Sequence, residues 1–355
     1  MRVGITADLH LTTKDSHPER YNAFLDILQQ CKQNEIERLI ISGDLFDAPL
    51  SNYSEFESIC KSSEFSKIEL HIIPGNHDAN INNKQIVATN VRIFDQPACI
   101  KLADGWEACF IPYRDAQTMG KAIGDVLEKG DNSQWALIGH GDWFGSFDEP
   151  NPYEDSKIYM PLTRKELDMF KPDFVFLGHI HVPQKNGNVY YAGSPCPVAA
   201  NETGYRRFLT LDTEYGKVDE IRVYNDFLFF NARLMVMPTK DEENLLLRQI
   251  EACKLDWNIS ENDIKRVKIR VDAIGYSNDR EFIVKTIEKG FDEFEFLDTP
   301  DVSKVGVAND IERNFIIEQF QENLINTDYP IGEEGQPNKE QITLKAMELV
   351  YGGRR

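Results

Sequence analysis

Residues 38–47 read Arg-Leu-Ile-Ile-Ser-Gly-Asp-Leu-Phe-Asp, a short apolar run that stops at Ser42-Gly43-Asp44. Such a run, closed by a glycine and a carboxylate, is typical of a buried strand followed by a sharp turn. Four more apolar runs end in polar motifs that contain five of the seven histidines: Asp8-Leu9-His10 after Arg2 to Ala7, Gly75-Asn76-His77-Asp78 after Lys67 to Ile73, Gly139-His140 after Trp135 to Ile138, and Gly178-His179-Ile180-His181 after Phe174 to Leu177. The sequence therefore predicts five short strands, each delivering polar side chains at its end.

Amphipathic segments separate these strands. Glu19 to Ile36 places apolar side chains three and four residues apart, as a helix with one buried face does: Tyr21, Phe24, Leu25, Leu28 and Cys31. Shorter helices are predicted at Tyr53 to Cys60 and Ala116 to Lys129. Strands that are buried on both faces and joined by helices predict the α/β class, and specifically a layered α/β sandwich.

The second half of the chain contains further strands and a smaller unit. Three strands are expected to form one meander: Val189 to Ala192, Phe208 to Leu211 and Glu220 to Tyr224. Phe227 to Pro238 is interpreted as a connector, and a compact β-α-β unit is expected between Lys265 and Leu297. Two helices follow, Asn309 to Ile325 and Lys339 to Tyr351. The predicted organisation is a first domain over residues 1–230, a smaller domain over 231–300 and a C-terminal helical segment over 301–355.

The chain has 355 residues and a formal net charge of −20. This length predicts one large domain and a smaller one. The negative charge gives no general attraction to DNA, so a nucleic-acid-binding function would depend on bound metal cations and local basic clusters. Three such clusters occur: Arg164-Lys165, Arg206-Arg207 and Lys265-Arg266-Val267-Lys268-Ile269-Arg270.

The six cysteines are widely spread and include no CxxC pair, so reduced thiols are expected, and disulfides and structural zinc are not. No apolar run approaches the roughly 18 residues that cross a bilayer, so no membrane association is expected. The N-terminus enters a strand directly, without the apolar core of a signal peptide. These features predict a cytoplasmic protein.

Ligands of open α/β sheets bind beyond the carboxyl ends of the strands, so the polar motifs are expected to converge there. Carboxylate, amide and imidazole donors together suit manganese, iron or catalytic zinc better than magnesium or structural zinc. The donors are too many for one ion and fit two ions that share a carboxylate. Such a pair acidifies a water molecule for attack on phosphorus, and a nearby non-ligand histidine could stabilise the transition state or protonate the leaving group.

The motifs, in this order, resemble those of the calcineurin-like metallophosphoesterase superfamily. Four of them resemble in particular the SbcD family of DNA-repair nuclease subunits, found in bacteria and bacteriophages: Gly43-Asp44-Leu45-Phe46-Asp47, Gly75-Asn76-His77-Asp78, Gly178-His179-Ile180-His181-Val182-Pro183-Gln184 and Ala192-Gly193-Ser194-Pro195. The resemblance covers residues 1 to about 225, and the unit after Lys265 is similar in kind to that family's DNA-capping domain. One departure is Leu11-Thr12-Thr13, where the family often has glycine after its first Asp-x-His-Leu.

The resemblance implies a ligand set and a reaction. It assigns Asp8, His10 and His181 to one metal, with Asp44 bridging, and Asn76, His140 and His179 to the other. His77 would be the histidine that acts on the phosphate or leaving group without binding metal. The implied cofactor is two divalent ions, typically manganese. The implied reaction is phosphodiester hydrolysis, exonucleolytic on duplex DNA ends and endonucleolytic on single strands.

The resemblance also implies partners. These are DNA, an SbcC-like coiled-coil ATPase and a second copy of the chain in a homodimer, acting in DNA-break repair and recombination. The chain contains no GxxxxGK[ST] phosphate loop, so any ATP dependence must come from the ATPase. The helix Asn309 to Ile325 carries Ile311, Phe315, Ile316 and Phe320 along one side and is a suitable docking element. If a phage encodes the chain, the expected cytoplasm is that of the host.

Two other functions are compatible with parts of the pattern. One is a stand-alone phosphatase or nucleotide phosphodiesterase with the same metal site. Protein phosphatases of the superfamily typically have Arg and Glu where this chain has Phe46-Asp47 and Asp78, which disfavours a phosphatase but leaves small phosphodiesters as substrates. The other is a non-catalytic scaffold protein, which missing ligands would favour; here none is missing.

Overall fold

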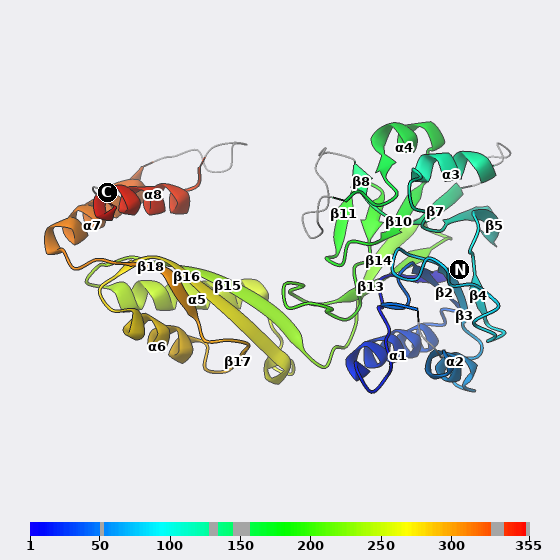
Figure 1. The fold of residues 1–355 in the computed structure, drawn as a ribbon, viewed down its shortest axis with the longest axis horizontal. Coiled ribbons are helices and arrows are strands. Elements are labelled where there is room, and N and C mark those ends of the chain that lie inside the picture. Colours follow the sequence, from blue (N-terminus) through cyan, green and yellow to red (C-terminus); the bar gives the residue numbers. More distant parts are fainter. Residues whose placement is uncertain (50–52, 128–133, 145–156, 328–336, 353–355) are drawn as a thin grey trace. The chain divides into compact units, whose positions relative to one another are not determined.

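The computed structural model describes residues 1–49, 53–127, 134–144, 157–327 and 337–352, and the chain forms two compact units (Figure 1). The first unit is Met1–Asp226 and the second is Phe227–Arg355. The boundary expected at residue 230 therefore falls a few residues earlier. Within the described ranges, no helix combines the length and the hydrophobicity needed to cross a membrane.

Two six-stranded sheets form the centre of the first unit. The first has the order β14 (Lys217–Arg222), β13 (Arg207–Asp212), β1 (Arg2–Thr6), β2 (Arg38–Ser42), β3 (Glu69–Ile73) and β4 (Val91–Ile93). The second has the order β11 (Gln184–Asn186), β12 (Val189–Tyr191), β10 (Phe174–Gly178), β7 (Gln134–His140), β6 (Trp106–Ile111) and β5 (Ala98–Ala103). Strands β1 to β4 are parallel, as are β6, β7, β10 and β12. The strands that carry the polar motifs therefore end at the same edge of their sheet.

Four helices cover the outer faces of the two sheets: α1 (Pro18–Gln33), α2 (Ser54–Lys61), α3 (Met119–Val126) and α4 (Arg164–Phe170). Successive side chains of a strand point to opposite faces. In β2, Leu39 and Ile41 pack in the core under α1 and α2, whereas Ile40 lies between the two sheets. In β10, Phe176 lies between the sheets and Leu177 packs in the core shared with α3. The layers follow this alternation (Figure 1), and the predicted α/β sandwich is confirmed.

The two sheets come close together where Gly178 ends β10. A Cβ atom at this position would lie 2.0 Å from the carbonyl oxygen of Ser42 and 2.7 Å from Nδ1 of His140. Only glycine leaves room for this approach. The glycine thus allows the ends of β2, β7 and β10 to meet, which is where the polar motifs lie.

The three strands predicted as one meander divide between the two sheets. β12 pairs in parallel with β10 in the second sheet, whereas β13 and β14 form a hairpin on the far side of β1 in the first. The single-meander prediction is therefore wrong. Short apolar runs fit either sheet, and only packing against distant strands decides between them. A separate two-stranded ribbon pairs β8 (Trp143–Phe144) with β9 (Leu162–Thr163).

The second unit is a four-stranded parallel sheet with helices. Its elements are β15 (Leu228–Val236), α5 (Glu242–Trp257), the 3-10 turn η1 (Ile264–Arg266), β16 (Val267–Ser277), α6 (Arg280–Gly290), β17 (Glu295–Phe296), β18 (Asp301–Val307), α7 (Ile311–Asn326) and α8 (Lys339–Tyr351). Helices α7 and α8 pack together through the buried side chains of Ile317 and Met347.

Two predicted boundaries of this unit differ from the structure. The segment 227–238, expected as a connector, contains the nine-residue strand β15, which pairs with β16 along its whole length. The segment 301–355, expected to be a separate helical piece, begins with β18, which also pairs with β16. Both differences have one cause. The long strand β16 pairs with β15 and with β18, and no local signal in the sequence indicates this pairing.

Cys99 and Cys109 form a disulfide, so the prediction that all cysteines are reduced is wrong. The two residues lie directly opposite each other in the antiparallel pair β5 and β6. The register of this hairpin brings them together, and their spacing in the sequence does not indicate it. The other four cysteines are free: Cys31, Cys60, Cys196 and Cys253.

Candidate metal centre

Four of the predicted ligands lie at the ends of strands in the first unit. Asp8 and Asp44 follow β1 and β2 closely, His140 is the last residue of β7, and His179 follows β10. Asp8, Asp44 and His179 have φ angles of +54°, +48° and +97°. Such angles cost a non-glycine residue roughly 1–3 kcal/mol and persist only where the surroundings enforce them. One such restraint is the hydrogen bond from the Asp8 amide to the carbonyl oxygen of Gly43, at 3.0 Å.

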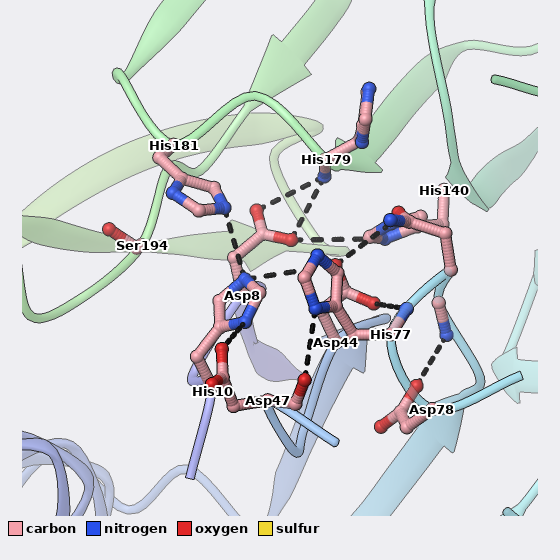
Figure 2. A network of polar contacts seen from close by, with 12 residues as sticks. Asp8, His10, Asp44, Asp47, His77, Asp78, His140, His179, His181 and Ser194 are labelled. Carbon is pink, nitrogen blue, oxygen red and sulfur yellow. Dashed lines mark hydrogen bonds and ion pairs between the residues drawn. The ribbon is translucent and has the colours of Figure 1, made fainter. Parts of the chain in front are cut away.

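One group of converging side chains consists of Asp8, His10 and His181 (Figure 2). Nδ1 of His10 lies 3.0 Å from Oδ1 of Asp47, and Nδ1 of His181 lies 2.8 Å from Oε1 of Glu202. Because an ionised carboxylate only accepts hydrogen bonds, each ring donates its Nδ1 proton. The Nε2 atoms of His10 and His181 are then both acceptors, and they are 3.0 Å apart. Two acceptors this close need a proton or a cation beside them, which fits a metal site.

A second group consists of Asp8, Asp44 and His140. Nδ1 of His140 donates to the carbonyl oxygen of Ser42 at 2.9 Å, so Nε2 is the ring nitrogen that faces the other side chains of the group. This Nε2 lies 2.8 Å from Oδ1 of Asn76 and 3.4 Å from Oδ2 of Asp44.

The Asp44 carboxylate lies between the two groups. Its Oδ2 atom lies 3.7 Å from Nε2 of His10, in addition to its approach to His140. Side chains that all present lone pairs to one small, buried space suit a pair of divalent cations that share this carboxylate.

The ring of His179 lies outside the converging groups that the described residues form. Its backbone amide donates to the carboxylate of Asp8 at 2.9 and 3.1 Å, while its ring points away from Asp8 (Figure 2). The ring packs against Tyr159, and its Nε2 lies 3.6 Å from Oδ1 of Asp142. This Nε2 is buried and has no hydrogen-bond partner in the described part of the chain. A metal role for His179 therefore stays a prediction that requires its ring to turn.

His77 is exposed and lies at the mouth of the cluster. Its Nδ1 lies 2.9 Å from the carbonyl oxygen of Asp47, so the ring donates there and its Nε2 remains available. Its backbone amide donates to Oδ1 of Asp44 at 2.9 Å. His77 also forms a third converging group with His10 and Asp44, so the geometry alone permits either a ligand or a substrate-facing residue.

Two residues near the site, Glu202 and Asp142, were not singled out from the sequence, and a third, Arg206, was expected only in a basic cluster. Glu202 and Asp142 contact the rings of His181 and His179. Arg206, expected to belong to a surface basic cluster, is fully buried and bonds to Glu202, so that expectation is wrong. The contacts with the two histidine rings join residues that are far apart in the sequence, and no local motif reveals them.

The electrostatics of the cluster favour a protonated His140 ring beside an ionised Asp44 carboxylate, whereas burial lowers the pKa of His179 to about 3. Burial alone would lower the pKa of His140, but the Asp44 charge and hydrogen bond, with Asp8, raise it to about 9. Burial alone would raise the pKa of Asp44, but His140 and His10 hold it below its usual range. Burial raises the pKa of Asp8. In the absence of cations, protons on His140 and Asp8 therefore balance the negative charge that bound metal would otherwise balance.

Asp78 supports the site from behind. It is buried, and its two carboxylate oxygens accept hydrogen bonds from the backbone amides of Gly75, at 2.7 Å, and Phe46, at 3.1 Å. Burial, together with the Asp44 charge, raises the pKa of Asp78 to about 7. Asp78 thus joins the turn after β2 to the turn after β3.

Metal binding is expected to strengthen as the pH rises from about 6.5 toward about 9, since His140 has a pKa near 9 in place of the ordinary 6.5. Below that pKa the ring carries a second proton, which a cation must displace, so binding releases protons. Calorimetry with Mn²⁺ in buffers of different ionisation enthalpy should show proton release at pH 7.5. Binding that is independent of both pH and buffer would contradict this assignment of protons.

An α/β sandwich with Asp, Asn and His side chains converging at its strand ends defines the class of metallophosphoesterases. The family model described as calcineurin-like phosphoesterase matches residues 1–183, more than half of the 355 residues, and the chain belongs to this family. It is therefore a hydrolytic phosphoesterase that uses divalent metal.

Two curated relatives are components of nucleases. The chain is 25% identical over 319 aligned positions to exonuclease subunit 1 of Enterobacteria phage T4, which covers 76% of this chain and 89% of the relative. It is 24% identical over 276 positions to the SbcD component of the SbcCD nuclease of Escherichia coli K12, which covers 63% of this chain and 68% of the relative.

Proposed function

We propose that the protein is a Mn²⁺-dependent DNA nuclease that hydrolyses phosphodiester bonds in DNA repair or recombination. The observation that carries the proposal is the arrangement of imidazole and carbonyl acceptors around one shared carboxylate, Asp44, with the exposed His77 at its mouth. The nuclease names of both relatives support DNA as the substrate.

The residues of the chain would divide the chemistry among them. Asp8, His10 and His181 would hold one cation, and Asn76, His140 and His179 the other, with Asp44 between them. Bound cations supply an acidified water and positive charge for the phosphate oxygens. The hydrogen bond of Nδ1 to Asp47 leaves Nε2 of His77 free, and the ring would stabilise the phosphate or protonate the leaving oxygen.

The nuclease proposal is tested with purified full-length protein and Mn²⁺. Linear duplex DNA should be shortened from its ends, and circular single-stranded DNA should be cut internally. The same reactions with Mg²⁺ or Zn²⁺ test the metal preference that the mixed nitrogen and oxygen donors indicate. Hydrolysis of mononucleotide phosphodiesters or phosphoproteins without cleavage of either DNA would overturn the nuclease assignment and leave the phosphoesterase.

An SbcC-like ATPase is the proposed partner, and α7 is the proposed docking element. Among the side chains of α7 that the structure describes, three large apolar ones are exposed: Ile311 at 84%, Phe315 at 59% and Ile316 at 52%. Ile311 and Phe315 are four residues apart and therefore lie on one side of the helix. The opposite side packs through Ile317 on α8, so the exposed side is available for another chain.

Docking through α7 predicts that Ile311→Glu with Phe315→Glu abolishes co-purification with the ATPase, while Mn²⁺-dependent nuclease activity of the isolated protein persists. Met169→Glu is the matched control, because Met169 is 63% exposed on α4 in the other unit. Equal retention of the ATPase by both variants would exclude α7.

The proposed homodimer rests on the resemblance alone, and sedimentation of the full-length chain tests it. A cytoplasmic location is also proposed, because the resemblance and the proposed DNA substrate both favour it.

A further inference from the structure

A polar network lies directly behind His181, and it is nearly closed to solvent. Glu202 is 6% exposed and Arg206 is 0% exposed. Oε1 of Glu202 faces Nδ1 of His181 at 2.8 Å. The ring of His181 thus has a carboxylate on one side and, on the other, the space where Nε2 meets Nε2 of His10.

The second oxygen of Glu202 is surrounded by donors. Oε2 accepts hydrogen bonds from the Ser194 hydroxyl at 2.9 Å, from the Val198 amide at 3.0 Å and from Nη2 of Arg206 at 3.3 Å. The amide and the guanidinium only donate, so the position of Oε2 requires an acceptor.

Arg206 fixes the network to the backbone. Its Nε donates to the carbonyl oxygen of Ser194 at 2.9 Å, and its Nη2 donates to the Ser194 hydroxyl at 2.7 Å and to the carbonyl oxygen of His181 at 2.5 Å. One buried guanidinium therefore binds both the carboxylate and the main chain of the histidine that the carboxylate orients.

We infer that Glu202, held by Arg206 and Ser194, is a positioning residue that keeps the proton of His181 on Nδ1 and so leaves Nε2 free to bind metal. The inference rests on the proposed metal site. Hydrogen bonds from a ligand histidine to a carboxylate set its tautomer in this way in metal sites. In this role the Glu202 side chain contacts neither substrate nor metal.

The inference makes an unusual prediction for Glu202→Gln, which preserves shape. The three donors at the Oε2 position require the amide oxygen there, so the amide nitrogen must face His181. The nitrogen donates, and Nδ1 of His181 must then accept. The ring would carry its proton on Nε2, pointing into the metal site, and the lone pair that binds metal would be lost.

Asp47 offers a matched control beside the other histidine of the same group. Its Oδ1 accepts from Nδ1 of His10 at 3.0 Å, as Glu202 does from His181. The Asp47 side chain is 41% exposed, and within the described residues no hydrogen-bond donor contacts its other oxygen. In Asp47→Asn the amide nitrogen can therefore face water, and the oxygen can stay on His10. The two substitutions are chemically alike and should differ in effect.

The test uses the full-length protein with ¹⁵N-labelled histidine. In the metal-free wild type, at a pH above the titration of the ring, NMR should find the His181 proton on Nδ1. It should move to Nε2 in Glu202→Gln, whereas the His10 proton should stay on Nδ1 in Asp47→Asn. Calorimetry with Mn²⁺ should show a loss of affinity of about 10–100-fold in Glu202→Gln, the range typical of outer partners of metal ligands, and a smaller loss in Asp47→Asn.

Each outcome bears on the inference. A wild-type His181 with its proton on Nε2 overturns it, even if Glu202→Gln fails to fold. It is also overturned if Glu202→Gln keeps the Nδ1 proton, or if the two variants lose affinity equally. A wild type that binds no Mn²⁺ refutes the proposed function instead, because the tautomer is read in the metal-free protein.

Discussion

Asp44→Asn is expected to empty both halves of the metal centre. Oδ2 of Asp44 lies 3.4 Å from Nε2 of His140 and 3.7 Å from Nε2 of His10, so a single carboxylate serves both converging groups. The asparagine keeps the shape but removes the negative charge that offsets two cations. The loss of Mn²⁺ affinity should exceed the roughly 10–100-fold typical of residues that only support ligands.

The effect of Asp44→Asn is measured as metal per chain after dialysis, by elemental analysis, and as DNA cleavage. Metal content should fall for both ions together, since neither retains its shared ligand, and cleavage should fall with it. Asp104→Asn is the control for the same chemical change, because the Asp104 side chain is 99% exposed in the turn between β5 and β6. Full metal loading and full activity in Asp44→Asn would rule out a bridging carboxylate.

The sequence was sufficient to place Asp8, Asp44 and His140 at one edge of the sandwich. Each follows or ends an apolar run, and parallel strands end on the same side of a sheet, so strand prediction alone brings these side chains together. The sequence also suggests why residue 178 is a glycine: it allows two strand ends to approach each other closely.

Features that depend on contacts between distant segments could not be predicted in the same way. Glu202 reaches His181 only because the chain after β12 folds back on the site. The strand β15 is defined by its pairing with β16, and the Cys99–Cys109 bond by the register of a hairpin. The ring of His179 is turned by its packing against Tyr159, which its position after β10 does not reveal.

His77→Ala is expected to lower the rate of DNA cleavage by about 10²–10⁴-fold, the range for a residue that transfers a proton in the transition state, with nearly normal metal content. The ring is held by its donation to the Asp47 carbonyl oxygen, and it lies edge-on to the ring of His10 with the two centroids 4.8 Å apart. The contact of His77 with Asp44 is made by the backbone amide, which alanine preserves. The substitution therefore removes the ring without disturbing the shared carboxylate.

Two measurements decide what the His77 ring does. Elemental analysis of His77→Ala separates a substrate-facing residue from a ligand: if metal content falls in step with the rate, the third converging group, His10, Asp44 and His77, is a true metal site. A phosphodiester with a nitrophenol leaving group then separates two chemical roles, because nitrophenolate departs without needing a proton. If His77 protonates the leaving oxygen, the deficit of the variant should nearly vanish on this substrate. An equal deficit on both substrates would show that the ring stabilises charge on the phosphate instead.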